Sequence, residues 1–252
     1  MLLKSKLKNN ELTVGTWLSL AHPGIAEIMV KAGFDWVTID LEHSVITFRE
    51  AEEMIRIIEL GGSVPLVRLS ANEPTQIKRV MDAGAHGLVV PMVNSRGDVE
   101  KAVASVHYPG RGKRGVGLAR AQGYGVAFHE YMEWLKKEVV IIVQIEHIDA
   151  VKNIEAILSS DDIDGYIIGP YDLSATMGLP GQFEHPDVVA VLKKIRDAGM
   201  LLKKPGGLHI VEPNPEELAS RIKEGFLFLA YSVDFRMLDV SSRAGLKIRD
   251  GL

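Results

Sequence analysis

Eight short apolar runs, most of them rich in β-branched residues, recur along the chain and alternate with longer amphipathic stretches. This alternation is typical of strand–helix units repeated around a parallel sheet. Most of the runs are almost continuously apolar, as expected of strands that are buried on both faces. The runs are TVGTWLSL from Thr13, DWVTIDL from Asp35, VPLVRL from Val64, GLVVPMV from Gly87, VVIIVQIE from Val139, IDGYIIGP from Ile163, GGLHIV from Gly206 and FLFLAYS from Phe226.

The stretches between the runs contain signals for helix ends. Two of them place apolar residues on one helical face ahead of a glycine, which predicts helices that stop at Gly61 and at Gly199. Asn214 followed by Pro215 predicts the start of another helix, with an N-cap and a proline at the first helical position. The segment PGRGKRGVG at 109–117 is too rich in glycine for regular structure.

These units predict one α/β domain over residues 1–252, a single (β/α)8 barrel of the TIM type. The chain length matches the ~250 residues usual for that fold. An open doubly wound sheet would give the same alternation over most of the chain, but no GxGxxG phosphate-binding motif follows the first run. The barrel is therefore the favoured architecture.

Composition narrows the possible ligands. Lys and Arg number 29 against 33 Asp and Glu, and this net charge of −4 offers no basic surface for nucleic acid or anionic lipid. No run approaches the ~18 apolar residues of a membrane span, and the N-terminus is polar, which favours a cytoplasmic protein that acts on small molecules. Zero cysteines exclude thiolate ligands and a cysteine nucleophile, so any metal would have oxygen or imidazole ligands, as magnesium, manganese or cobalt can have.

Polar residues gather at the C-terminal ends of the runs, where the chemistry of a (β/α)8 barrel takes place. Glu146 and Asp172 follow neighbouring runs, and two carboxylates leave open positions on a hard cation for water and a chelating substrate. The alternative is that the two acids bind backbone amides or an arginine. Their arrival on adjacent strands beside Gly169 and Pro170 favours a metal site.

Three further residues near the strand ends are candidates for moving protons or binding oxygen. His43 is the candidate acid/base, because it follows a strand within the polar cluster and an imidazole titrates near neutrality. Asp82, near the end of the helix after the third run, would orient His43, although spacing alone indicates a surface acid. Arg68 ends the third run and has two explanations: it pairs with an anionic substrate oxygen, or it forms a salt bridge to Asp40 or Glu42.

Gly169 and Pro170 would let the backbone approach a ligand, and the amides after Pro170 are candidates for binding a carboxylate.

The positions of the lysines decide between a metal-dependent mechanism and a Schiff-base mechanism. A Schiff-base mechanism needs a lysine at the end of a strand, and none of the eight runs ends in one. Lys203 and Lys204 precede the seventh run and therefore belong to the opposite end of the barrel. The residues favour the metal-dependent route.

At this polar cluster the sequence closely resembles the HpcH/HpaI family of aldolases. The segments that carry the resemblance are WVTIDLEHS at 36–44, VQIE at 143–146 and IDGYIIGPYDLSATMG at 163–178. The similarity covers nearly the whole chain, including PMV at 91–93 and YPGRGKRGVG at 108–117. Three features depart from the family pattern, namely Val45, Ser232 in YSVD and KKPGG at 203–207, and they concern the pocket for the second substrate.

The resemblance implies a divalent-metal-dependent (class II) aldolase acting on 2-oxo acids. Glu146 and Asp172 match the family's metal ligands, and His43 and Asp82 match its base and the acid paired with it. Arg68 matches the residue that steadies the enolate oxygen. Members assemble as trimers or hexamers and exchange C-terminal helices, so 240–252 is expected to pack on another subunit. The positions that match substrate-binding or pocket residues are Trp17, Gln144, Gly169, Pro170 and Tyr171.

The predicted reaction is the reversible cleavage of a 4-hydroxy-2-oxo acid to pyruvate and an aldehyde. The oxo acid would chelate the metal, a base near His43 would remove the C4 hydroxyl proton, and Arg68 and the metal would stabilise the enolate. A citramalyl- or malyl-CoA lyase would share the acidic pair but would need a larger site for an acyl-CoA. A non-catalytic barrel that binds 2-oxo acids is the alternative outside enzymes, and it would not require a base.

Overall fold

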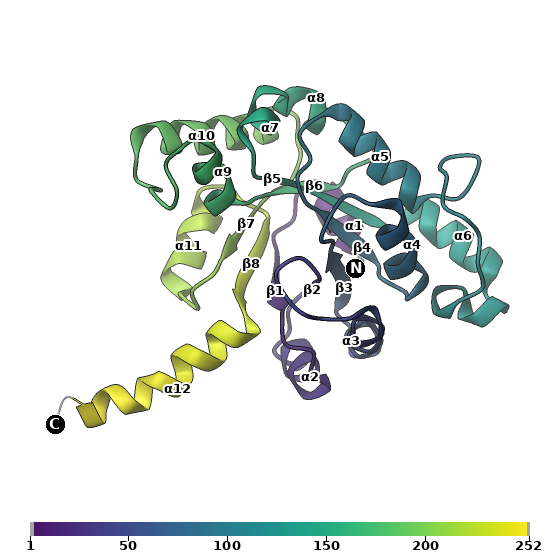
Figure 1. The fold of residues 1–252 in the computed structure, drawn as a ribbon, viewed down its shortest axis with the longest axis horizontal. Helices are drawn as coiled ribbons and strands as arrows, with labels where there is room; N and C mark the ends of the chain where they lie inside the picture. The colour runs from purple at the N-terminus through teal and green to yellow at the C-terminus, as the bar shows by residue number, and fades with distance from the viewer. Residues whose placement is uncertain (1–2, 251–252) are drawn as a thin grey trace.

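Eight parallel strands close into a barrel in the computed structural model, which describes residues 3–250 (Figure 1). The strands follow one another around the barrel in chain order, and β8 pairs with β1 to close it. The predicted (β/α)8 architecture and its eight strands are confirmed. The strands are β1 (Thr13–Leu18), β2 (Trp36–Asp40), β3 (Val64–Arg68), β4 (Gly87–Val90), β5 (Val140–Ile145), β6 (Gly165–Ile168), β7 (Gly206–Ile210) and β8 (Phe228–Val233).

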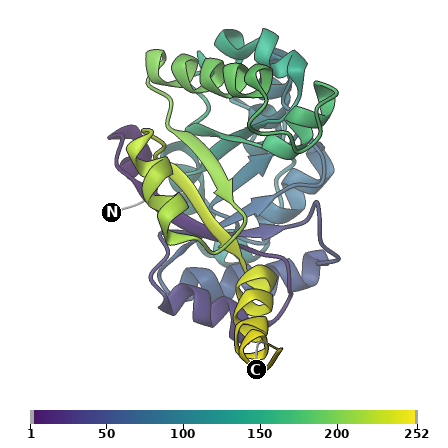
Figure 2. The ribbon, with the colours of Figure 1, turned by 90° about the vertical axis from the view of Figure 1, so that its left-hand side faces the viewer.

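Helices surround the barrel, as the two views in Figures 1 and 2 show. Because a helix follows each strand and returns the chain to the start of the next, every helix that leads directly into a strand ends near the N-terminal end of the barrel. The helical segments are α1 (Leu3–Lys8), α2 (Pro23–Lys31), α3 (Phe48–Leu60), α4 (Pro74–Asp82), α5 (Arg96–Val106), the 3-10 helix η1 (Arg120–Gly125), α6 (Phe128–Lys137), α7 (Ile148–Lys152), α8 (Ile154–Leu158), α9 (Pro170–Thr176), α10 (Pro186–Leu201), α11 (Pro215–Lys223) and α12 (Asp234–Asp250).

The core has two layers, one inside the barrel and one between the strands and the helices. Inside, Trp36 and Phe228 stack with ring centroids 4.1 Å apart. Gly15 makes room for them, since a β-carbon built there would lie 2.0 Å from the Trp36 ring. The barrel interior is therefore packed with side chains, and a ligand can enter only at its ends.

The helix boundaries follow most of the predicted signals. Asn214 caps α11 by accepting hydrogen bonds from the amides of Glu216 and Glu217, and segment 109–117 has no helix or regular strand, as predicted. The prediction that a helix stops at Gly199 is wrong, because α10 continues to Leu201. This glycine serves packing instead, since a β-carbon built there would lie 2.3 Å from the Tyr166 hydroxyl.

The C-terminal helix α12 projects away from the barrel (Figures 1 and 2). Asp234 fixes its first residue by accepting hydrogen bonds from the amides of Ser19 and Leu20, which follow β1. Beyond this point α12 exposes apolar side chains, among them Phe235 and Leu238. Within residues 3–250, no helix is long and apolar enough to cross a lipid bilayer.

Candidate active site

A cavity of about 430 Å³ opens at the C-terminal ends of the strands. Two larger hollows, of about 560 and 540 Å³, lie between helices on the outer surface and contain none of the predicted site residues. Eight of the ten predicted site residues line the cavity at the strand ends: Trp17, His43, Arg68, Gln144, Gly169, Pro170, Tyr171 and Asp172. The strand ends therefore bring together residues that are far apart in the sequence.

Glu146 lies directly behind this cavity, at the end of β5, and is almost fully buried. One carboxylate oxygen accepts a hydrogen bond from the Met92 amide at 2.6 Å, and the other accepts one from the Gln144 side chain. Met92 directs its amide there from a left-handed backbone conformation, with φ of 52°. Gly169 allows the close packing, since a β-carbon built there would lie 2.9 Å from the Glu146 β-carbon.

Carboxylates face one another across this part of the mouth. Burial raises the pKa of Glu146, and the nearby charge of Asp172 raises it further. The hydrogen bonds from Gln144 and Met92 lower this pKa but do not outweigh burial. Burial also raises the pKa of Glu42 to about 7, although the positive charge of Arg68 opposes the shift. The negative charges of Glu146, Asp40 and Asp172 add to it. Such mutual repulsion is costly unless a cation is present.

The oxygen donors fit a hard divalent cation. Glu146 supplies a carboxylate just after β5, and Asp172 supplies another from the first turn of α9, which follows β6. The Glu42 Oε2 is buried without a hydrogen-bond partner in the described part of the chain. Across residues 3–250, no three Asp, Glu, His or Cys side chains converge closely enough to hold a metal by themselves. The arrangement therefore suits a cation whose remaining positions are filled by water and substrate.

Arg68 forms the salt bridge that was one of its two sequence-based explanations. Its Nε and Nη2 donate to the two Asp40 carboxylate oxygens at 2.9 and 2.7 Å, and Nη1 lies 3.4 Å from Glu42 Oε2. Burial opposes ionisation of Asp40, but the Arg68 guanidinium outweighs it and lowers the Asp40 pKa. The guanidinium also lies 4.2 Å from the centre of the Trp17 ring, and this packing fixes it at the edge of the cavity.

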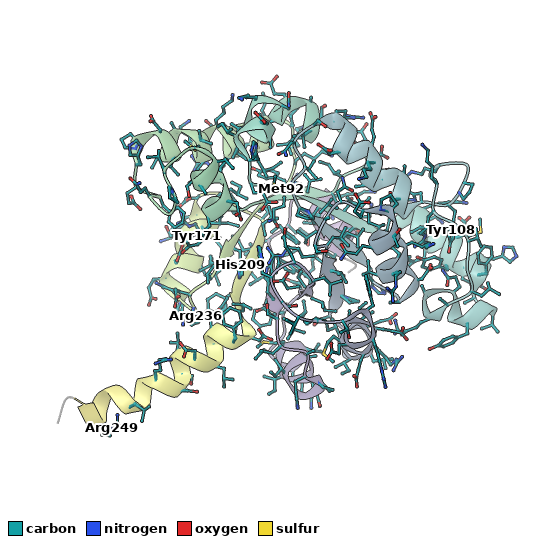
Figure 3. The ribbon with its side chains drawn as sticks, viewed as in Figure 1. Met92, Tyr108, Tyr171, His209, Arg236 and Arg249 are labelled. Atoms are coloured by element: carbon teal, nitrogen blue, oxygen red, sulfur yellow. The ribbon has the colours of Figure 1, made fainter. Side chains whose placement is uncertain are left out.

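His43 lies exposed in the loop after β2, and its amide donates to Asp40 at 3.2 Å. Asp82 does not lie near His43 of the same chain. Because α4 runs back from the mouth, Asp82 at its last turn lies near the N-terminal ends of the strands, where Gln122 donates to it at 3.4 Å. Asp82 and His43 therefore do not meet within one chain, and the prediction that Asp82 orients His43 is not tested by a single subunit. Tyr108, which binds Gln122 at 2.7 Å, lies across the molecule from Tyr171 and His209 (Figure 3).

His209 is a cavity residue that sequence reasoning missed, because His43 was the only histidine singled out. It lies on β7 and stacks on Trp17, with ring centroids 5.0 Å apart and planes inclined by 9°. Its Nε2 lies 3.1 Å from the Ser232 carbonyl oxygen, and burial lowers its pKa to about 4. The strand register indicates that His209 points into the barrel. Gly207 pairs with Ile167, whose side chain lies in the barrel interior, and residues two apart in a strand face the same way.

The fold and the site together define a class: a (β/α)8-barrel enzyme with a carboxylate-lined mouth. A family model described as "HpcH/HpaI aldolase/citrate lyase" matches residues 13–239. The 4-hydroxy-2-oxo-heptane-1,7-dioate aldolase of Salmonella paratyphi C is 41% identical over 242 residues, which are 93% of this chain and 89% of that protein.

Two solved structures extend the similarity to the fold. The HpcH/HpaI aldolase of Desulfitobacterium hafniense has a TM-score of 0.90 and 31% identity, over 100% of this chain and 98% of that one. A family protein of Burkholderia cenocepacia has a TM-score of 0.92 and 30% identity, over 98% of both chains. The chain belongs to the HpcH/HpaI aldolase/citrate lyase family. The predicted resemblance is confirmed, as is the prediction of a lyase.

Proposed function

We propose that this chain is a divalent-metal-dependent aldolase that reversibly cleaves a 4-hydroxy-2-oxo acid to pyruvate and an aldehyde. The observation that carries the proposal is the pair of carboxylates, Glu146 and Asp172, at a mouth that also holds Arg68 and His43. Oxygen ligands of this kind suit magnesium, manganese or cobalt. When bound, the cation would withdraw electrons from the 2-oxo group of the substrate and so favour formation of an enolate.

The protein groups around the carboxylates would position the substrate. Gln144 and Met92 hold the Glu146 carboxylate in one orientation, so little reorganisation is needed when a ligand arrives. Gly169, Pro170 and Tyr171 form the adjoining wall, where the backbone would lie against the substrate carboxylate. The Trp17 ring packs against the Arg68 guanidinium and supports it.

The bond-breaking step uses His43 and Arg68. His43 would accept the proton of the C4 hydroxyl, the C4–O bond would become the aldehyde carbonyl, and the electrons of the C3–C4 bond would pass to the C2 oxygen. Arg68 Nη1 lies 3.4 Å from Glu42 Oε2 and makes no hydrogen bond to it. This nitrogen would donate to the C2 oxygen. Protonation at C3 then releases pyruvate.

Removing the metal tests the proposal. Protein treated with EDTA should lose cleavage of 4-hydroxy-2-oxo acids and should regain it on addition of magnesium, manganese or cobalt. Borohydride treatment in the presence of pyruvate serves as the control, and it should not inactivate the protein because, within residues 3–250, no strand carries a lysine at its C-terminal end. Full activity in stripped protein would contradict a metal-dependent mechanism.

Free oxo acids are preferred to CoA thioesters in this proposal. The relatives at 41% identity bear the name of an aldolase for a free oxo acid, which does not favour a citramalyl- or malyl-CoA lyase. Assay of both substrate types with the same preparation separates the two reactions. Cleavage of CoA thioesters but not of free oxo acids would contradict the proposed aldolase and favour a citramalyl- or malyl-CoA lyase.

We also infer that the chain acts as a homo-oligomer, a trimer or hexamer in which α12 packs on a neighbouring subunit. In support, α12 projects from its own barrel and exposes Leu238, Val240 and Leu246. Oligomers commonly bury such surfaces at symmetric interfaces. Light scattering should give three or six chains per particle, and a monomer at working concentration would contradict this.

In such an assembly Asp82 would reach the His43 of a neighbour. Asp82 is partly exposed beside a loop that presents Val116 and Leu118 to solvent, as a surface that docks on another subunit would. Mixed oligomers test this arrangement, because His43→Ala and Asp82→Asn chains each keep the residue that the other lacks. Equal mixing should restore about one quarter of the sites, since half of the chains supply each intact residue. No recovery in verified mixed oligomers would contradict it.

A further inference from the structure

The cavity has two chemically different walls. The carboxylates Glu146 and Asp172 lie just after β5 and at the start of α9, whereas a second part of the wall is formed where β7, β8 and α12 meet. Val211, Val233 and Phe235 make this second wall apolar. His209 places an imidazole ring among them.

The hydrogen bond to Ser232 fixes the tautomer of His209. A carbonyl oxygen only accepts hydrogen bonds, so the imidazole Nε2, at 3.1 Å, must be the nitrogen that carries the proton. Neutral imidazole has a single N–H, and Nδ1 is therefore an acceptor. Stacking on Trp17 holds the ring in the plane that this bond requires.

Ser232 presents its carbonyl to His209 through an unusual backbone conformation. Its φ is 57°, at the point where the pairing of β8 with β1 shifts by one residue. Its hydroxyl donates to the Val211 carbonyl at 2.9 Å, and its carbonyl also accepts from Thr16 at 3.3 Å. These contacts hold the bulge in place, so the position of the acceptor for His209 is built into the strand.

The surroundings of His209 favour the neutral ring. Burial lowers its pKa to about 4, and the positive charge of Arg68, which also packs on the Trp17 ring, acts in the same direction. The Ser232 carbonyl opposes this shift, and so does Asp40, which is itself paired with Arg68. Near neutral pH the ring therefore offers Nδ1 as a lone-pair acceptor.

Among the described residues that line the cavity, none offers this wall an unpaired counter-charge for a carboxylate. Arg68 gives two nitrogens to Asp40 and turns the third toward Glu42. Arg236, at the start of α12, donates to Glu212 at 2.7 Å and to Asp239 at 2.7 Å (Figure 3 shows its place). A carboxylate here would meet another acceptor at His209, and two acceptors without a shared proton repel each other.

We propose that His209 determines the aldehyde specificity of this chain, by accepting at Nδ1 a hydrogen bond from a hydroxyl group of the aldehyde fragment. The preferred aldehydes are therefore hydroxyaldehydes, and aldehydes that carry a carboxylate at the distal end are disfavoured. This inference rests on the proposed aldolase function and specifies its second substrate. It differs from the acid-bearing substrate named for the Salmonella relatives.

Matched aldehyde pairs test the inference, with pyruvate as the donor. Lactaldehyde and propionaldehyde differ by one hydroxyl group, and succinic semialdehyde carries a carboxylate where butyraldehyde carries a methyl group. The wild-type chain should favour lactaldehyde in kcat/KM by about three- to tenfold, the usual effect of one neutral hydrogen bond, and should favour butyraldehyde over succinic semialdehyde. His209→Phe, which keeps a ring against Trp17, should bring the lactaldehyde preference close to one.

Two further variants sharpen the result. His209→Asn keeps an amide donor and an acceptor and should retain part of the lactaldehyde preference. His86→Phe, which replaces a histidine at the opposite end of the barrel, should leave both ratios unchanged. If His209→Phe does not fold, nitrogen NMR of the wild-type protein decides: Nδ1 should be unprotonated and should respond to lactaldehyde more than to propionaldehyde.

The outcomes separate this inference from the function on which it rests. Wild-type protein that does not exchange the C3 protons of pyruvate in a metal-dependent way fails the proposed function itself. Exchange without a lactaldehyde preference, an unchanged ratio in His209→Phe, or a preference for succinic semialdehyde overturns the role of His209 alone. A protonated Nδ1 in the NMR measurement overturns it as well.

Discussion

Partly or fully buried acids have pKa shifts of opposite direction at the two ends of the barrel, as Glu59 shows at one end and Glu42 and Glu146 show at the other. At the N-terminal end Glu59 and Asp164 are paired with bases: His86 and Arg120 lower the pKa of Glu59 to about 2 against the effect of burial, and Lys4 binds Asp164 at 2.9 Å. At the C-terminal mouth, burial and neighbouring acids raise the pKa of Glu42 and of Glu146. One end is arranged for stability, whereas the other keeps unfavourable charges that a bound cation would relieve.

Removing a carboxylate at the mouth should give the largest effect on activity. Glu146→Gln should lower kcat/KM by about 10³-fold or more, because several kcal/mol of transition-state stabilisation depend on the cation. The metal-free variant should be no less stable than the metal-free wild type, because a repelling charge has been removed. Steady-state kinetics and thermal unfolding measured together check this, and a large loss of both would make Glu146 a structural acid.

Crowding the same carboxylate should come next. Gly169→Ala places a β-carbon 3.0 Å from Glu146 Oε2, so the carboxylate must move. A misplacement of this size is expected to cost about 10²-fold in kcat. Gly97→Ala in α5 is the matched control, since a β-carbon there would make only an ordinary contact, 3.6 Å from Ser95 Oγ. Equal activity of the two variants would show that the orientation of Glu146 is unimportant.

The N-terminal end should respond in stability. Asp164→Asn removes the ion pair with Lys4 but keeps an acceptor for the Ile141 amide, which donates at 2.9 Å. The free energy of unfolding should fall by about 2 kcal/mol, as for a lost hydrogen bond between charged groups, and kcat should stay near the wild-type value. Denaturant titration provides the number. A loss of kcat without a loss of stability would remove the contrast between the two ends.

The effect that is smallest at neutral pH appears only on acidification. Burial lowers the pKa of His209 and of His107 from 6.5 to about 4, so between these values the unfolded chain binds protons that the folded chain does not. Stability is therefore complete above pH 6.5 and is lost as the pH falls toward 4, by at most about 1.4 kcal/mol per pH unit for each group. His107→Phe should flatten the profile of unfolding free energy against pH, and an unchanged slope would contradict the assignment.

The sequence predicted the strands and most of the mouth, for a physical reason. Apolar runs mark buried parallel strands, and in a closed barrel all strand ends meet at one rim, so Glu146, Asp172 and Arg68 could be brought together without coordinates. Met92 could not be predicted, because its part depends on a left-handed backbone that directs an amide at Glu146.

Two positions lay beyond the sequence for equally definite reasons. Asp82 was paired with His43 on resemblance, but within one chain an acid in the last turn of α4 lies at the end of the barrel where β4 begins, so the pairing stands as a prediction between subunits. His209 was passed over as one histidine among eight, although its inward register on β7 brings it to the cavity. Strand parity would have found His209, and helix direction would have shown that Asp82 needs a neighbouring subunit.

One measurement tests the central claim most directly: a crystal structure of the protein grown with Mn²⁺ and pyruvate, in which anomalous scattering locates the ion. The ion should lie between the carboxylates of Glu146 and Asp172, with pyruvate bound to it inside the mouth. Manganese found only elsewhere, or pyruvate bound in the mouth without an ion shared by these two side chains, would contradict the account.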